Sequence, residues 1–124
     1  MTKKILIIED DDFFRGLISK KLLFEGFDVY MAINGEEAIK KMKDTKPSLI
    51  LLDLLLPNID GFEVLSKIKQ DPETASVPVI IVSNLGDKED IDKGLKLGAV
   101  DYLIKSQFTP EMIIEKVKNV FVKK

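Results

Sequence analysis

Short apolar runs alternate with amphipathic stretches along the whole chain. Each apolar run is rich in Ile, Leu or Val, which predicts a strand buried in a sheet. Between the runs, and after the last one, apolar residues recur at intervals of three and four, which predicts amphipathic helices. The five predicted strands are residues 5–8, 28–31, the apolar run that carries Asp53 within 48–57, 77–82 and 100–104.

Capping residues and helix breakers delimit five predicted helices. The expected N-terminal signals are Asp11 or Asp12, Asn34 with Glu37, Asp60 with Glu63, the stretch 87–90, and Thr109 followed by Pro110. The expected stops are Gly26, Asp71-Pro72 and Gly98. Gly94, inside the fourth helix, weakens that prediction by roughly 1 kcal/mol relative to Ala.

The connections between these strands are too long for hairpins, so the alternation predicts right-handed βαβ units. The expected fold class is therefore α/β: a five-stranded parallel sheet flanked by five helices on both faces. In such a sheet the carboxyl ends of all strands lie along one edge, where ligands bind. We expect the function at that edge.

Polar side chains follow four of the five predicted strands. Glu9 and Asp10 follow the first strand, Asp53 the third, Ser83 the fourth and Lys105 the fifth. Three converging carboxylates repel one another unless a cation lies between them. The chain contains no His or Cys, so hard oxygen ligands remain and Mg²⁺ is the expected metal.

Taken singly, each of these residues has an ordinary structural explanation, such as a helix cap, a polar strand end or a solvated lysine. Together they form a site suited to a phosphoryl group. Lys105 would neutralise one phosphoryl oxygen, Ser83 would hydrogen-bond another, and the metal would bridge a third. The carboxylate of Asp53 can itself be the nucleophile, which gives an aspartyl phosphate.

Composition narrows the possible functions further. A chain of 124 residues supports one core, so one domain over residues 1–124 is expected. A net charge of −2 and a pI of about 5.2 argue against direct nucleic-acid binding. The N-terminal charges are followed by only four apolar residues, 5–8, so neither an export signal nor membrane insertion is predicted. Without Cys, a cytoplasmic location is expected.

The chain resembles, end to end, the receiver domain of two-component response regulators. Four motifs in the family's order and spacing carry the resemblance: Ile-Leu-Ile-Ile-Glu9-Asp10-Asp11; Leu-Leu-Asp53-Leu-Leu-Leu-Pro57 with Asp60-Gly61; Val-Ile-Ile-Val-Ser83; and Gly98-Ala-Val-Asp-Tyr102-Leu-Ile-Lys105. The resemblance implies a flavodoxin-like sheet with strand order 2-1-3-4-5.

The resemblance also implies a role for each site residue. Asp53 would accept a phosphoryl group from a phosphohistidine on a histidine kinase or phosphotransfer protein, in a phosphorelay. Glu9, Asp10, Asp53 and the backbone carbonyl of Leu55 would hold Mg²⁺. The protein would catalyse its own phosphorylation and slow dephosphorylation rather than act as an ordinary enzyme.

The same resemblance implies how the signal leaves the site. Ser83 and Lys105 would contact the phosphoryl group, and Tyr102 would turn inward when Ser83 is drawn toward the phosphate. This movement would change the surface of the fourth helix, fifth strand and fifth helix, where a downstream protein would bind. A bias of a few kcal/mol on a two-state element is enough for such a switch.

The sequence departs from the family pattern at four positions near the site. Ser106 stands where the family usually has a Pro, often after a cis peptide bond, so an altered loop path is expected after Lys105. Asn84 replaces a small residue, so it would narrow access to Asp53 or offer the phosphoryl group a hydrogen bond. We hypothesise that Leu55 and Leu85 exclude attacking water and lengthen the life of the aspartyl phosphate.

Three other functions stay open at this point. A metal-dependent phosphatase would need a second Asp two residues after Asp53, where Leu55 stands. A receiver-like module that binds proteins without phosphorylation is disfavoured by Asp53 and Lys105 but is compatible with Ser106 and Asn84. Flavin binding is poorly supported, because the strand-end loops are acidic rather than rich in Gly, Ser and Thr.

Overall fold

The computed structural model describes residues 2–122 and has the predicted α/β architecture. The strands are β1 (Lys4–Ile8), β2 (Asp28–Ala32), β3 (Leu49–Leu52), β4 (Val79–Ser83) and β5 (Asp101–Ile104). The helices are α1 (Asp12–Phe24), α2 (Gly35–Thr45), α3 (Gly61–Gln70), α4 (Lys88–Lys96), the 3₁₀ turn η1 (Lys105–Gln107) and α5 (Pro110–Val120). Every predicted strand and α-helix is present, whereas η1 was not predicted.

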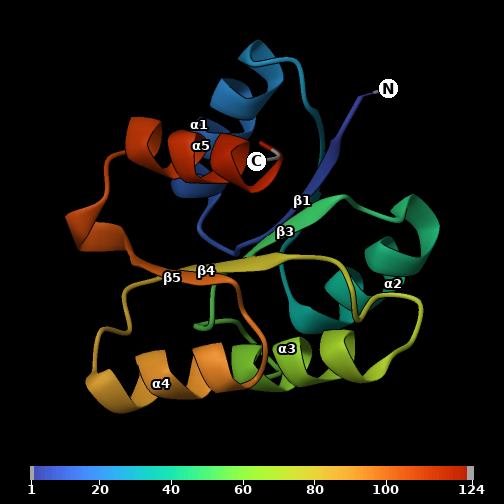
Figure 1. Ribbon diagram of the computed structural model, residues 1–124, viewed down its shortest axis with the longest axis vertical. Helices are drawn as coiled ribbons and strands as arrows, with labels where there is room; N and C mark the ends of the chain where they lie inside the picture. The colour runs from blue at the N-terminus through green and yellow to red at the C-terminus, as the bar shows by residue number, and fades with distance from the viewer. Residues whose placement is uncertain (1, 123–124) are drawn as a thin grey trace.

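The five strands form one parallel sheet in the order β2-β1-β3-β4-β5, which confirms the flavodoxin-like topology. Helices α1 and α5 cover one face, and α2, α3 and α4 cover the other (Figure 1). The less apolar second strand lies at a sheet edge. Among residues 2–122, no helix is both long enough and apolar enough to cross a membrane.

The alternation of side chains along each strand divides the core into two layers. In β1, Leu6 and Ile8 face the layer under α2 and α3, whereas Ile5 and Ile7 face the layer under α1 and α5. All four side chains are buried. This burial on both faces explains why the strands appear in the sequence as continuous apolar runs.

Most of the predicted helix caps form. Asp11 rather than Asp12 caps α1, and its side chain accepts from Phe14 N. Asn34 caps α2 in the same way, and Glu37 reaches back to Ile33 N. The remaining caps are Asp60, which accepts from Phe62 N rather than Glu63 N; Thr109, which accepts from Met112 N; and Asp87, which has no side-chain cap bond.

The fourth and fifth strands have boundaries that differ from the prediction. The fourth strand begins at Val79 rather than Val77, since Pro78 has no N–H to donate to a sheet ladder. It also extends to Ser83, and the fifth strand begins at Asp101 instead of Val100. The shift moves Ser83 from a loop into the sheet, where its backbone is fixed.

Candidate functional site

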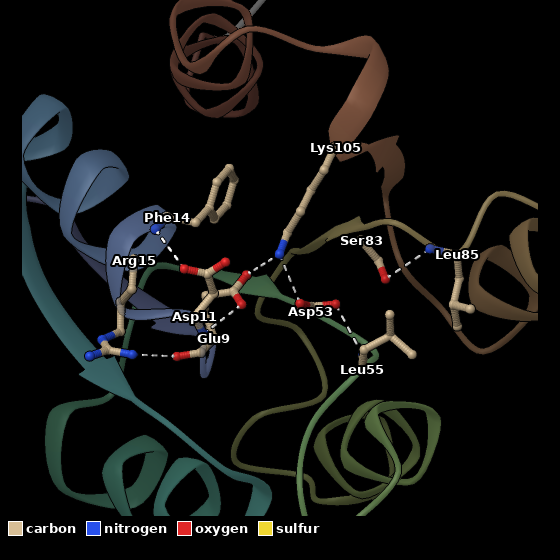
Figure 2. Close-up of polar contacts among 9 residues, drawn as sticks. All are labelled: Glu9, Asp11, Phe14, Arg15, Asp53, Leu55, Ser83, Leu85 and Lys105. Atoms are coloured by element: carbon tan, nitrogen blue, oxygen red, sulfur yellow. Dashed lines mark hydrogen bonds and ion pairs between the residues drawn. The ribbon is translucent and has the colours of Figure 1, made fainter.

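Three charged side chains meet at the carboxyl edge of the sheet. Lys105, which follows β5, places its Nζ 2.7 Å from Oε1 of Glu9 and 3.0 Å from Oδ2 of Asp53 (Figure 2). Glu9 follows β1 and Asp53 follows β3, which are neighbours in the sheet. The side chains are only 3%, 5% and 13% exposed for Glu9, Asp53 and Lys105. The site is therefore a buried cluster of two carboxylates and one ammonium group.

The backbone holds the second oxygen of each carboxylate. Asp11 N donates to Oε2 of Glu9 at 3.1 Å, and Leu55 N donates to Oδ1 of Asp53 at 3.0 Å. Both bonds span two residues, as in the turns that follow a strand end. Each carboxylate therefore accepts from a backbone N–H on one oxygen and contacts Lys105 with the other.

Burial and charge shift the protonation of this cluster. Burial raises the pKa of Glu9 to about 7; the hydrogen bond from Lys105 opposes this rise, and the charge of Asp53 adds to it. Burial by itself would lower the pKa of Lys105, but the bonds to Glu9 and Asp53 outweigh it and hold that pKa above its ordinary value. Lys105 is therefore a cation at neutral pH, whereas Glu9 changes between its protonated and its ionised form near that pH.

A third carboxylate lies beside this cluster. Glu9, Asp10 and Asp53 each offer one oxygen, and these three oxygens lie within 4.8 Å of one another. Asp10 is exposed, so this side of the cluster is open to solvent. Three hard oxygen donors without His or Cys fit Mg²⁺ in the chemistry of their ligand set.

Ser83 and Tyr102 are joined through one loop residue. Leu85 N donates to Oγ of Ser83 at 3.3 Å, and the hydroxyl of Tyr102 donates to the carbonyl oxygen of Leu85 at 2.6 Å. Ser83 is fully buried and Tyr102 is nearly so, which means that the ring already points inward in this structure. Burial raises the pKa of Tyr102 to about 12, and the negative charges of Asp90, Asp53 and Asp87 act in the same direction.

Two residues of α1 that sequence reasoning did not assign to the site also reach it. The Phe14 ring lies under the ammonium of Lys105, with 4.5 Å between its centroid and Nζ. Arg15 donates from Nη1 to the carbonyl oxygen of Glu9 at 3.0 Å. Arg15 is the only Arg of the sequence, so its place just after an acidic run was a usable signal. Phe14 had the spacing of a core residue and carried no such signal.

Four residues that depart from the family pattern lie around the cluster: Leu55, Asn84, Leu85 and Ser106. No peptide bond among the described residues is cis, and the chain after Lys105 turns through η1. Asn84 is exposed, and so is half of Leu55, whereas Leu85 packs partly against the core. Leu55, whose carbonyl was expected to bind metal, directs its N–H to Asp53.

Known proteins are similar to this chain in sequence and in fold. The sequence model of the response regulator receiver domain family matches residues 5–118. Over 120 residues the chain is 38% identical to the alkaline phosphatase synthesis transcriptional regulatory protein PhoP of Bacillus subtilis, and this match covers 97% of the chain and 49% of PhoP. The chain spans about half the length of the curated relatives it matches.

Solved structures agree in fold. The Vibrio cholerae chemotaxis protein CheY4 matches with a TM-score of 0.90 at 25% identity, over 98% of this chain and 100% of CheY4. The phosphorylated cyanobacterial phytochrome response regulator RcpA matches with a TM-score of 0.84 at 32% identity, over 97% of this chain and 91% of RcpA. By the extent of the family match and the identity to PhoP, this chain belongs to the response regulator receiver domain family.

Proposed function

We propose that this chain is a phosphorylation-activated switch of a two-component phosphorelay, with Asp53 as the phosphoryl acceptor. The observation that carries the proposal is the contact of Asp53 with Lys105, a buried carboxylate 3.0 Å from a buried ammonium at the sheet edge where ligands bind. The receiver domain would comprise residues 1–124. One solved relative, RcpA, is itself a phosphorylated response regulator.

The donor would be a phosphohistidine on a histidine kinase or phosphotransfer protein. A carboxylate oxygen of Asp53 attacks phosphorus as the bond between phosphorus and the donor's imidazole nitrogen breaks. The electron pair of that bond returns to the imidazole, which takes up a proton. Asp53 then carries an acyl phosphate, and a water molecule later cleaves it to restore the carboxylate and release inorganic phosphate.

The chain's own side chains would stabilise the transferred group. Lys105 is already beside Asp53 and would neutralise a phosphoryl oxygen, and the hydroxyl of Ser83 would donate to another. Glu9, Asp10, Asp53 and the backbone carbonyl of Leu55 would hold Mg²⁺. When bound, Mg²⁺ supplies positive charge to the phosphoryl oxygens.

The bonded path from Ser83 through Leu85 to Tyr102 would carry the signal away from Asp53. If Ser83 moves toward a phosphoryl group, its bond to Leu85 N is the first to change, and Leu85 is also the acceptor for the Tyr102 hydroxyl. Tyr102 lies in β5 and packs against Gly94 of α4. The surface formed by α4, β5 and α5 would therefore differ between the two states and bind a downstream protein in one of them.

We also propose that Leu55 and Leu85 slow the hydrolysis of the aspartyl phosphate. Both residues follow site residues by two positions, and neither offers a polar group that would orient a water molecule. Leu55→Asn and Leu85→Asn should each speed dephosphorylation. An unchanged lifetime of the phosphorylated form in both variants would count against this role.

The decisive experiment is intact mass spectrometry after incubation with acetyl phosphate, with and without Mg²⁺. The wild type should gain one phosphoryl group only when Mg²⁺ is present, and Asp53→Asn should gain none. Asp87→Asn is the matched control, because Asp87 is exposed and its side chain caps no helix donor. Absence of any gain in wild type would favour a receiver-like module that binds its partner without phosphorylation.

A further inference from the structure

The ammonium of Lys105 has three partners, and one of them is an aromatic ring. Two are the carboxylates of Glu9 and Asp53, and the third is the face of Phe14, 4.5 Å from Nζ. A cation over an aromatic face is attracted by the ring's quadrupole, more strongly when both groups are shielded from water. Lys105 is largely buried and Phe14 is partly buried, so this contact is shielded.

The position of Phe14 is fixed from two sides. Its backbone N–H donates to the capping side chain of Asp11 at 3.1 Å, which sets the first turn of α1. Its side chain packs against the apolar layer under α1 and α5, to which Ile18 and Ile113 belong, and the three residues line the same small cavity. Phe14 therefore contacts Lys105 from a rigid support rather than from a loop.

The three partners differ in what a divalent cation would do to them. Glu9 and Asp53 are two of the three carboxylates that can bind a metal, so a bound cation would compete with Lys105 for their oxygens. Mg²⁺ takes oxygen ligands and retains its water, and an aromatic face offers it nothing comparable. The contact with Phe14 is thus the one that remains available to Lys105 when the acids are engaged.

We propose that Phe14 is a positioning residue that holds the Lys105 ammonium beside Asp53 while Glu9 and Asp53 bind a divalent cation. The effect of Phe14 on phosphoryl transfer rests on the proposed function, but its effect on the position of the Lys105 ammonium does not. Without the ring, the only groups left to hold Lys105 would be the two carboxylates that the metal also binds, and its ammonium would move into solvent. With the ring in place, the ammonium stays beside Asp53, where the phosphoryl group would arrive.

The test follows the Lys105 ammonium directly, by NMR of protein labelled with ¹⁵N-lysine, in the presence of chelator or of saturating Mg²⁺ and without any phosphoryl donor. Phe14→Leu keeps an apolar side chain and removes the aromatic face. Phe13→Leu is the matched control, because Phe13 is the next residue and is 79% exposed. Phe14→Tyr should restore the wild-type behaviour, and Lys105→Gln identifies the signal.

We expect Phe14→Leu to match wild type with chelator and to show ammonium proton exchange roughly fivefold faster with Mg²⁺, the factor that about 1 kcal/mol of cation–π attraction provides. Equal exchange in Phe14→Leu and wild type with Mg²⁺ would overturn the proposal. Exchange that is about fivefold faster in Phe14→Leu than in wild type with chelator as well would also overturn the proposal, since that result indicates a general packing role. A Lys105 signal that never responds to Mg²⁺ in wild type would also overturn it, because the carboxylates are then not engaged.

A second measurement separates this role from the proposed function. Phosphorylation by acetyl phosphate in Mg²⁺ should be about fivefold slower in Phe14→Leu at saturating donor, with the half-saturating donor concentration unchanged. If wild type gains no phosphoryl group, the proposed function fails, whereas the ammonium exchange still decides the role of Phe14. If wild type is phosphorylated and Phe14→Leu reacts at the same rate, Phe14 has no part in the transfer.

Discussion

The Nζ of Lys105 lies 2.7 Å from Oε1 of Glu9, closer than to Asp53, the proposed acceptor. Glu9 thus has a cationic partner within the chain, and that partner is the same lysine that would neutralise an oxygen of the phosphoryl group on Asp53. A metal ion bound by Glu9 has to share or replace this ammonium. If a cation binds here, the site would therefore couple three events: binding of that cation, movement of Lys105 and protonation of Glu9.

The first prediction concerns the competition between Lys105 and the metal. Lys105→Met removes one positive charge from the cluster and frees oxygens of Glu9 and Asp53. We expect Mg²⁺ to bind this variant roughly tenfold more tightly than wild type, a gain of about 1.4 kcal/mol. Isothermal titration calorimetry measures the difference. Lys88→Met, on an exposed lysine paired within α4, should leave the affinity unchanged, and weaker binding by Lys105→Met would refute the competition.

The second prediction follows from the raised pKa of Glu9. Between the ordinary value of 4.5 and the folded value of about 7, the folded protein binds more protons at Glu9 than the unfolded chain does. The stability contributed by protonated Glu9 is therefore complete below pH 4.5 and is lost as pH rises through about 7. At 1.36 kcal/mol for each pKa unit, the loss is about 3 kcal/mol.

Urea unfolding in chelator, at a series of pH values, measures this loss. Wild type should lose more stability than Glu9→Gln between pH 4.5 and pH 7, because Gln carries no titrating proton. The comparison with Glu9→Gln cancels the contribution of the other carboxylates. Parallel pH profiles for the two proteins would show that Glu9 titrates at its ordinary value.

The third prediction uses Tyr102 as an optical probe of the inward state. Its pKa is raised to about 12, mainly by burial, and the phenol is the neutral form of the group. The stability that it contributes is present below its ordinary pKa of 10 and is lost as pH rises through about 12. In a Tyr30→Phe background Tyr102 is the only tyrosine, so ultraviolet absorbance of tyrosinate follows it alone.

The inward ring predicts where this transition falls. In the unphosphorylated Tyr30→Phe variant the absorbance transition should lie near pH 12. A transition near pH 10, the ordinary value, in the unphosphorylated protein would mean that the ring leaves the core in solution. Tyr102→Phe, which lacks the bond to Leu85, checks that the signal comes from this residue.

The parts of the fold that the sequence predicted are those with local signals. Strand periodicity and the caps at Asp11 and Asn34 are read from residues a few positions apart, and both caps form. The shared sheet edge then brings Glu9, Asp53 and Lys105 together, which topology alone was enough to predict.

What the sequence did not predict depends on distances between side chains that are far apart along the chain. The ring of Phe14 meets Lys105 from another element of the fold, and periodicity marks Phe14 only as a core position. Lys69 was missed for a different reason: its partners are near in sequence, but they are the backbone carbonyl oxygens of Ala75 and Val77, through which Lys69 fastens α3 to the segment before β4. Burial lowers the pKa of Lys69, but nothing in the local sequence separates it from a solvated lysine.

The fourth prediction concerns Gly94, whose place in α4 counted against a helix when only propensity was considered. A Cβ at Gly94 would lie 2.6 Å from Cδ1 of Ile81 and 3.1 Å from Cδ2 of Tyr102, so the missing side chain is what lets α4 approach the sheet. Gly94→Ala should therefore destabilise the fold by about 1–3 kcal/mol in spite of its better helix propensity, because overpacking outweighs that gain. It should also disturb Tyr102 and lower its pKa from about 12 toward the ordinary value.

Gly16 of α1 provides the matched control for this substitution. It also lies inside a helix, but a Cβ there would meet nothing within 4 Å. Gly16→Ala should therefore show the propensity gain alone and stabilise the protein by about 0.5–1 kcal/mol. Urea unfolding of the two variants gives the signs directly. Stabilisation by both alanines would show that α4 has room against β4 and β5, and Tyr102 would then be free to move without displacing the helix.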